Sequence, residues 1–178
     1  VAASHGSESS IVSRVGMERN YAPYTWAQTS PSDAAVAYAN GYADGYDVQI
    51  AKRIADGLGK ELEIVQTEWD GLIPALNSGK VDAVIAGMSA TEERKLSVDF
   101  SDNYYESQLV MVVRKDGPYA DADSLSDFAG ARITGQLNTF HYGVIDQIEG
   151  VNKQTAMETF PAMGVALNSR KIDGYVSV

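Results

Sequence analysis

The chain has 178 residues, 44% of them hydrophobic and 21% charged, so it is long enough to bury a core as one domain or as two small lobes. Its formal net charge of −10 argues against nucleic acid as a partner, because phosphate binding needs a basic face. With no cysteine and two histidines, His5 and His141, the sequence offers neither a disulfide framework nor a thiolate or histidine-rich metal centre, and we expect no cofactor.

The amino-terminal stretch VAASHGSESS is small and polar, and we expect residues 1–10 to form a flexible tether. No signal peptide is visible, but a mature exported chain would have lost it. Apolar residues then predict a first strand over residues 10–17, which leads into an aromatic loop over residues 18–26. Residues 27–45 show no clean period and are predicted to form a long loop.

A parallel α/β sheet is predicted next. Apolar residues at helical spacing after Asp47 predict a helix that Asp47 caps and that ends near Gly57. A strand, a short helix and a buried strand follow over residues 62–65, 70–79 and 81–86. The alternation of strands and helices is typical of a parallel sheet.

The remaining elements are predicted on both sides of a break at residues 115–118, the sequence KDGP. We expect this break to divide a first lobe, residues 11–114, from a second lobe, residues 115–178. Residues 97–100 and 107–114 look extended. Beyond the break we predict a helical turn, a strand, a helix, a weak strand, a helix and a strand over residues 124–128, 131–135, 139–148, 153–158, 159–168 and 172–178.

One octapeptide recurs across this break. ALNSGKVD at residues 75–82 returns as ALNSRKID at residues 166–173, each between a helix and a strand, and an aromatic residue, Trp69 or Phe160, precedes each helix. Similar helix ends arising twice by chance would explain the match. We favour two related α/β units, whose cleft would suit a clamp for a small molecule.

The turn after the buried strand carries candidate ligand groups. Residues 87–91, GMSAT, are small and hydroxyl-rich, and Arg94 follows them. Small residues at the carboxyl end of a strand let backbone amides approach a ligand, and an arginine offers a two-pronged fork to a carboxylate. The alternative is an ordinary strand–turn–helix with a solvated run of charges.

The segments WDGLIPALNSGKVD and GMSATEERKLSVDFS closely resemble recurrent segments of the solute-binding proteins that serve polar amino-acid ABC importers, solute-binding family 3. RVGMERNYAPYTW, GYADGYDVQIAKRIADGLG, SDNYY and VVRK extend the resemblance over the first lobe, and GARITGQLNTFHY and KIDGYVS over the second. The resemblance implies a type II periplasmic-binding-protein-like fold: two α/β lobes with mainly parallel sheets and a cleft between them.

The resemblance also implies binding residues in the first lobe. Tyr21 and Trp69 would sandwich the ligand side chain, since aromatic rings grip aliphatic stems and stack on guanidinium groups, although core packing is the alternative for either ring. Glu18 matches a position where relatives that bind cationic amino acids often carry an acidic residue. Some glutamine binders also carry one, so arginine or lysine leads, then histidine or glutamine. The alternative for Glu18 is an exposed loop carboxylate paired with Arg19.

The backbone of the ligand is expected to bind at the turn after the buried strand. By resemblance, Gly87 and Ser89 would offer backbone and hydroxyl groups, and Met88 would supply backbone or an apolar wall. Arg94 would clamp the α-carboxylate of the ligand.

In the second lobe the resemblance points to residues 139–141. Thr139 would add hydroxyl and amide donors to the same carboxylate. Phe140 and His141 follow it, and His141 stands where many relatives carry glutamine. A surface histidine with a satisfied side chain is the alternative for His141.

The family normally places an acidic residue, which binds the ligand ammonium, directly after the strand that IDGYVS matches. Here that position is Val178 and the chain stops. We therefore expect an incomplete second lobe, and an open sheet edge of this kind favours a dimer or a swapped assembly.

The resemblance implies a binding protein, not an enzyme, that captures an extracellular amino acid and passes it to an ABC permease. It is expected at the cell surface as a lipoprotein, or in the periplasm; no apolar run of about 18 residues is present to span a membrane. One alternative is a cyclohexadienyl or arogenate dehydratase-like enzyme on the same fold, for which Glu18 and His141 would be the candidate acid or base. Another is the ligand-binding ectodomain of a receptor.

Overall fold

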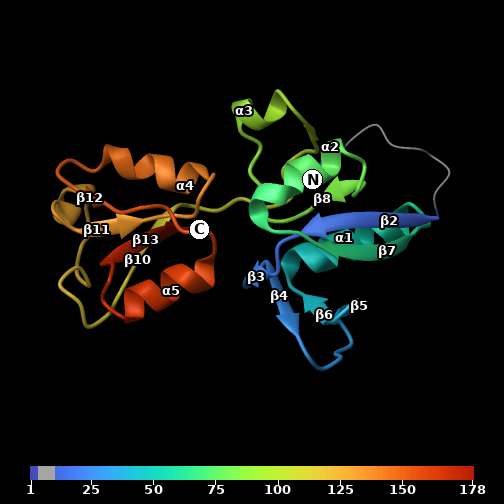
Figure 1. The fold of residues 1–178 in the computed structure, drawn as a ribbon, viewed down its shortest axis with the longest axis horizontal. Helices are drawn as coiled ribbons and strands as arrows, with labels where there is room; N and C mark the ends of the chain where they lie inside the picture. The colour runs from blue at the N-terminus through green and yellow to red at the C-terminus, as the bar shows by residue number, and fades with distance from the viewer. Residues whose placement is uncertain (4–10) are drawn as a thin grey trace. The chain divides into compact units, whose positions relative to one another are not determined.

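The computed structural model describes residues 1–3 and 11–178, which divide into two units, Val1–Tyr104 and Tyr105–Val178 (Figure 1). Each unit has its own α/β sheet and its own buried core. Among the described residues, no helix is both long enough and apolar enough to cross a membrane.

The main sheet of unit 1 has the strand order β7-β2-β8-β1-β9. These strands are β1 (Ala2–Ala3), β2 (Val12–Met17), β7 (Glu61–Gln66), β8 (Ala83–Val84) and β9 (Asp99–Phe100). β2 runs parallel to β7 and β8, and β1 runs antiparallel to β8 and β9. The parallel centre confirms the sheet that the alternating elements predict.

The helices α1 (Tyr46–Gly57) and α2 (Leu72–Asn77) cover this sheet with the apolar faces that the sequence predicts. The short η1 (Trp69–Gly71) precedes α2, and α3 (Glu92–Lys95) has no buried residue. Val48 of α1 and both Leu72 and Leu76 of α2 have no exposed surface and pack in one cluster with Met17 of β2. Burial of such side chains stabilises the unit by about 1.5–3 kcal/mol each.

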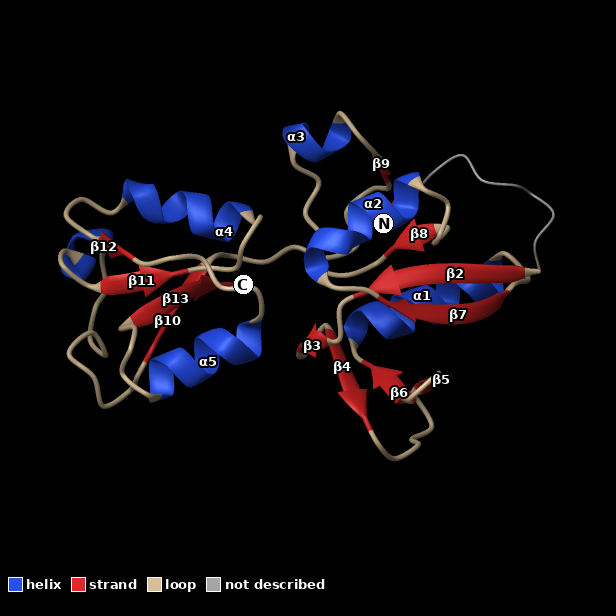
Figure 2. Cartoon of the chain, in the orientation of Figure 1, coloured by secondary structure: helices blue, strands red, loops and turns tan. Residues whose placement is uncertain are grey.

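The predicted loop over residues 27–45 is wrong. The chain there forms most of a second, antiparallel sheet of order β3-β4-β6-β5, drawn at the lower right of Figure 2. Its strands are β3 (Asn20–Tyr21), β4 (Thr25–Gln28), β5 (Val36–Tyr38) and β6 (Gly41–Asp44). Strands this short, most of whose residues are not fully buried, carry too few apolar residues to show an alternating pattern.

Unit 2 has a sheet of order β10-β13-β11-β12, with β11 parallel to both β12 and β13, and β10 antiparallel to β13. The strands are β10 (Val110–Val113), β11 (Arg132–Thr134), β12 (Asn152–Lys153) and β13 (Gly174–Ser177). The helices are η2 (Leu125–Phe128), α4 (Phe140–Gly143), η3 (Val144–Gln147) and α5 (Phe160–Asn168). Figure 2 shows α4 and α5 on opposite sides of this sheet, and each side has its own apolar cluster.

Two predicted boundaries differ from the structure. The extended segment that we placed at the end of the first lobe contains β10, which pairs with β13 along its whole length, so it belongs to unit 2. Ala2 and Ala3, predicted to lie in a flexible tether, form β1, whose backbone pairs with strands on both sides. Residues 4–10 of that predicted tether lie outside the described residues.

The recurring octapeptide is confirmed as a repeated local structure. In unit 1, Asp82 accepts hydrogen bonds from the backbone N of Arg14 (2.8 Å), its Nε (3.1 Å) and its Nη2 (2.8 Å). In unit 2, Asp173 accepts the same three bonds from Arg132 at 2.9, 3.0 and 2.9 Å. The backbone N–H of each aspartate donates to the carbonyl of its arginine at 2.8 Å. We call each arrangement an Arg–Asp fork.

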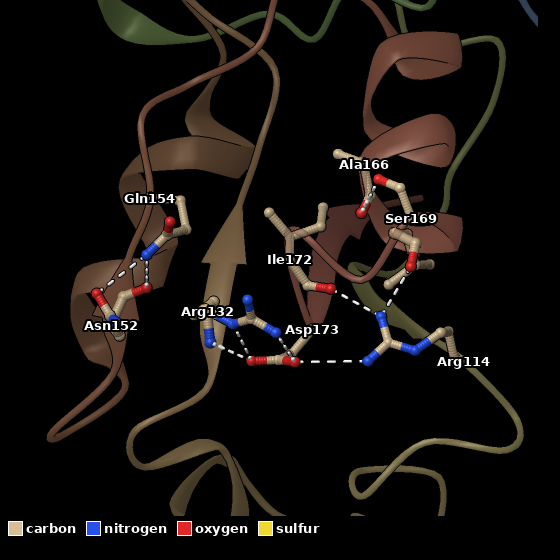
Figure 3. A network of polar contacts seen from close by, with 9 residues as sticks. Arg114, Arg132, Asn152, Gln154, Ala166, Ser169, Ile172 and Asp173 are labelled. Atoms are coloured by element: carbon tan, nitrogen blue, oxygen red, sulfur yellow. Dashed lines mark hydrogen bonds and ion pairs between the residues drawn. The ribbon is translucent and has the colours of Figure 1, made fainter.

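The fork of unit 2 has an additional arginine (Figure 3). Arg114 donates from Nη1 to the carbonyls of Leu167 (2.8 Å) and Ile172 (2.7 Å), and its Nη2 lies 3.5 Å from Asp173 Oδ1. The Asp173 side chain is 10% exposed, against 35% for Asp82. The hydrogen bonds from Arg132 hold the pKa of Asp173 below its usual value. Because both arginines face one buried carboxylate, removal of that carboxylate leaves charge uncompensated in unit 2.

Asp173→Ala is therefore expected to lower the free energy of unfolding of unit 2 by about 3 kcal/mol. Asp82→Ala, the matched change in the more exposed fork, is expected to cost unit 1 less, because solvent screens that pair. Hydrogen exchange of unit 2 amides reports the first loss. Tryptophan fluorescence reports the second, since Trp26 and Trp69 both lie in unit 1. Equal losses in the two variants would contradict the difference between the forks.

Candidate functional site

The turn of residues 87–89, which we call the ligand loop, follows β8 and needs glycine at its first position. Gly87 has a φ of +60°, in the left-handed region that favours glycine. A Cβ at Gly87 would lie 3.5 Å from Tyr21 Cε1 and 3.8 Å from Asp47 Oδ2. Gly87 and Ser89 are exposed, whereas Met88 is partly buried against the unit 1 core. The loop therefore exposes Gly87 and Ser89 to solvent, while Met88 packs it against the unit 1 core.

Arg94 is held beside this loop. Thr91 caps α3 by accepting a hydrogen bond from the Arg94 backbone N (3.3 Å), and the Arg94 side chain donates from Nη1 to the Ser89 carbonyl (2.9 Å). Its Cζ lies 5.3 Å from the centroid of the Trp69 ring. Burial lowers the pKa of Arg94, but a guanidinium remains charged at neutral pH. The structure thus brings two other predicted site residues, Ser89 and Trp69, to the guanidinium of Arg94.

Tyr21 and Glu18 lie where β2 ends and β3 begins. The Tyr21 side chain is 9% exposed and its ring lies 4.9 Å from that of Tyr24. Glu18 is 4% exposed, and its carbonyl accepts a hydrogen bond from Thr25 Oγ1 (2.6 Å). The alternative of an exposed loop carboxylate is therefore wrong. The guanidinium of Arg19 lies 3.6 Å from the centroid of the Tyr38 ring.

Residues 139–141 lie in unit 2, at the start of α4. Thr139 donates from Oγ1 to the Gln136 carbonyl (2.7 Å), which uses its one hydroxyl proton within the unit. Phe140 is 37% exposed, and His141, at 8% exposed, is buried and not a surface histidine. The His141 ring packs edge-on against Phe140 (4.7 Å between centroids) and lies 6.5 Å from Phe160.

Asp47 is the site residue that sequence reasoning misassigned. We predicted it as the cap of α1, but the cap position is Gly45, no side chain caps the helix there, and Asp47 is the second helical residue. Its backbone N–H donates to the Tyr24 carbonyl (2.9 Å), and its side chain has no exposed surface. Tyr104 donates to Asp47 Oδ1 at 2.7 Å. An aspartate at a helix start usually caps it, so no local pattern indicates this second role.

The Asp47 carboxyl is strongly perturbed. Burial raises its pKa to about 6, against the opposing effects of the Tyr104 hydroxyl and the Gly87 backbone N–H. Burial, followed by the charge of Asp47, also raises the pKa of Tyr104. Strongly perturbed acids occur more often at functional sites than elsewhere. Among the described residues, no three acidic or imidazole side chains gather as metal ligands would.

Comparisons with known proteins identify the family of the chain. Residues 13–174 match the family described as bacterial extracellular solute-binding proteins, family 3. A probable histidine-binding protein of Campylobacter jejuni is 34% identical over 178 residues, 98% of this chain. The arginine-binding extracellular protein ArtP of Bacillus subtilis is 41% identical over 95 residues, which cover 53% of this chain and 36% of ArtP.

A solved structure gives the same result for the fold. The arginine-bound form of a truncated arginine-binding protein from T. maritima is 32% identical, with a TM-score of 0.79 over 93% of this chain and 73% of that one. The match confirms the predicted periplasmic-binding-protein-like fold. The chain spans 63% of the length of the C. jejuni protein.

The raised pKa of Asp47 predicts a pH dependence of stability. Between its usual pKa of 3.8 and about 6, the folded chain holds a proton that the unfolded chain releases. Unit 1 should therefore lose stability as the pH rises through this window, by up to about 3 kcal/mol above pH 6. Asp47→Asn cannot ionise and should escape this loss.

Urea unfolding followed by tryptophan fluorescence, at about pH 4 and about pH 7, tests this prediction. The stability of Asp47→Asn relative to the unmodified chain should rise with pH. A difference that stays constant between the two pH values would contradict the raised pKa.

Proposed function

Because the chain belongs to the bacterial extracellular solute-binding proteins of family 3, we propose that it binds a free amino acid outside the cytoplasm and delivers it to an ABC permease. The observation that carries the proposal is the arrangement of Arg94, Trp69 and the ligand loop within unit 1. It combines a fixed cation, an aromatic face and exposed backbone, which are the groups that an amino acid needs.

Arg94 is the proposed clamp for the ligand α-carboxylate. The bond from Nη1 to the Ser89 carbonyl fixes the plane of the guanidinium, so part of the ordering entropy is lost before the ligand arrives. A planar fork meets two carboxylate oxygens at once, and partial burial strengthens the attraction. The Ser89 hydroxyl and the Gly87 backbone would complete the contacts to the ligand backbone.

We propose that the site is specific for an amino acid with a cationic side chain. Glu18 is buried and lies near Tyr21 in the chain, and its carboxylate is the proposed partner of a cationic ligand head. Tyr21 and Trp69 would hold the aliphatic stem and the charged head of arginine or lysine. The names of the relatives, histidine-binding and arginine-binding, support a cationic ligand, with glutamine as the neutral competitor.

Thr139, Phe140 and His141 of unit 2 are proposed as further contacts of the amino acid, and the ligand would favour the conformation for which it has the higher affinity. No chemical step is needed, so we propose binding without turnover and not a dehydratase. Unchanged arginine recovered after incubation, with no conversion of a prephenate-like substrate, would support this choice over the enzyme.

The setting of the protein is proposed from its family. Solute-binding relatives of this family are extracellular or periplasmic, and we propose attachment to the cell surface as a lipoprotein.

β10 lies at an edge of the unit 2 sheet, and its Val110 is 49% exposed. We propose that a second copy pairs along this edge, which sedimentation velocity over a range of concentrations would detect.

Arg94→Ala is expected to weaken arginine binding by roughly 100-fold or more, because the carboxylate would lose its charged partner. Isothermal titration calorimetry measures the loss, and circular dichroism checks that the variant is folded. Arg53→Ala, which removes an exposed arginine of α1, is the matched control and should bind normally. Near-normal affinity in Arg94→Ala would refute the clamp.

Glu18→Gln is expected to weaken arginine binding by roughly 10- to 100-fold and glutamine binding by far less. The amide keeps the shape of the side chain but removes the counter-charge of the guanidinium. Titrations of both ligands into both proteins give the comparison. Equal losses for the two ligands would remove Glu18 as the specificity residue.

A further inference from the structure

Asp47 contacts two parts of unit 1 that are distant in the sequence. Its Oδ1 accepts the 2.7 Å hydrogen bond from Tyr104, and its Oδ2 lies 3.8 Å from where a Cβ of Gly87 would stand. Oδ2 has no hydrogen bond of good geometry within the described part of the chain, yet the Gly87 backbone N–H is close enough to lower the carboxyl pKa. The carboxylate therefore lies directly behind the ligand loop.

We propose that Asp47 is a positioning residue for the ligand: its carboxylate holds the Gly87 peptide in the orientation that presents the ligand loop to the amino acid. The inference deepens the proposed function and rests on it. Asp47 acts from behind the loop, while Tyr21 packs against the same glycine with its Cε1 3.5 Å from the Cβ position. The two side chains therefore meet Gly87 near the same point, the position that a Cβ would take.

The free energy that the fold loses by burying the Asp47 carboxylate supports a functional role for this residue. A fully buried charge without a cationic side chain at hydrogen-bond distance destabilises the fold, and an apolar residue at this position of α1 would avoid the cost. The start of a 12-residue helix offsets part of it. An ionised carboxylate accepts hydrogen bonds only, so it can hold the Gly87 N–H and the Tyr104 hydroxyl at once. A neutral acid has to use one oxygen as a donor.

The hydrogen bond from Tyr104 also links Asp47 to the end of unit 1. It is the last residue of unit 1, and α1 also holds it through Tyr46, whose ring stacks on it at 6.1 Å and whose hydroxyl donates to its carbonyl at 3.2 Å. One carboxylate thus touches both the ligand loop and the residue at which the chain leaves the unit. Movement of the loop when a ligand binds would reach this residue directly.

Several groups face the Asp47 carboxylate and enter its titration. From the ligand loop comes the Gly87 N–H, and from the segment after β9 comes the Tyr104 hydroxyl, whose raised pKa keeps it neutral at physiological pH. From the residue before β1 comes the amino group of Val1, whose own pKa is lowered by burial. The Tyr21 ring lies near the same Cβ position of Gly87. Any titration that persists without the carboxylate belongs to one of these groups.

The amide resonance of Gly87 reports the contact without any ligand. In ¹⁵N-labelled protein, its chemical shift followed from about pH 4.5 to about pH 8 should move with a midpoint near 6. Asp47→Asn should abolish that midpoint. Asp56→Asn, the same charge change on the exposed face of α1, should retain it. A Gly87 midpoint near pH 6 that survives in Asp47→Asn would overturn the proposal.

Calorimetry with L-arginine tests the positioning role. At about pH 7.5, folded Asp47→Asn should bind about tenfold more weakly than Asp56→Asn, and its affinity should vary less with pH. Affinity within about twofold of the control would overturn the proposal.

Two further outcomes are decisive. If Asp47→Asn does not fold, Tyr104→Phe replaces it: loss of the hydroxyl donor should move the Gly87 midpoint upward, and an unmoved midpoint would refute the contact. If the unmodified chain binds no amino acid, the proposed function fails, and the Gly87 titration still decides whether Asp47 holds the loop.

Discussion

The Arg–Asp fork is the interaction on which both units depend. In unit 1 it ties Asp82, just before β8, to Arg14 of β2, and in unit 2 it ties Asp173, just before β13, to Arg132 of β11. Each aspartate bonds a backbone amide as well as a guanidinium, so the fork fixes strand register and not merely proximity. The carboxyl ends of the strands that it aligns lead to the candidate site: β2 to Glu18, and β8 to the ligand loop. Ligands of parallel sheets bind at such ends.

The aspartates of this chain occur in two different environments, with opposite effects on their pKa. The fork aspartates have arginine partners, which hold the pKa of each below its usual value, and their charge stabilises the fold. Asp47 instead accepts a hydrogen bond from the Tyr104 hydroxyl and lies near the Gly87 N–H, and burial raises its pKa to about 6. The first arrangement belongs to the scaffold. The second costs stability next to the ligand loop, where perturbed groups are expected if they act on a ligand.

Sequence reasoning recovered the parts of the fold whose signal is local. The helix spacing after residue 46 and the buried strand after residue 81 depend on neighbours within one turn or one strand. The octapeptide repeat is visible in the sequence, but the arginine partners of its aspartates lie 68 and 41 positions away. The sheet within residues 20–44 was missed because its short strands pair with one another and carry little apolar pattern. The placement of β10 in unit 2 depends on β13, more than 60 residues later in the chain, which no local pattern encodes.

In the candidate site, too, residues close in the sequence were predicted and contacts between distant residues were not. Arg94, Trp69 and Ser89 were predicted from one continuous stretch and meet in the structure. A short loop and the capped α3 connect Ser89 to Arg94. Asp47 was misassigned, since its role depends on Gly87 and Tyr104, which are 40 and 57 positions away in the sequence. Burial of Glu18 and His141 could not be predicted from their flanking residues either, and both alternatives that placed them at the surface are wrong.

A thermal-shift scan of the chain with arginine, lysine, histidine, glutamine and glutamate tests the central claim most directly, with tryptophan fluorescence recorded because Trp69 lies against Arg94. A ligand at about 100 times its dissociation constant adds about 2.7 kcal/mol of stability. The account predicts a clear rise in melting temperature with arginine or lysine and none with glutamate. No rise with any of the five, or a rise with glutamate alone, would contradict a binding site for a cationic amino acid.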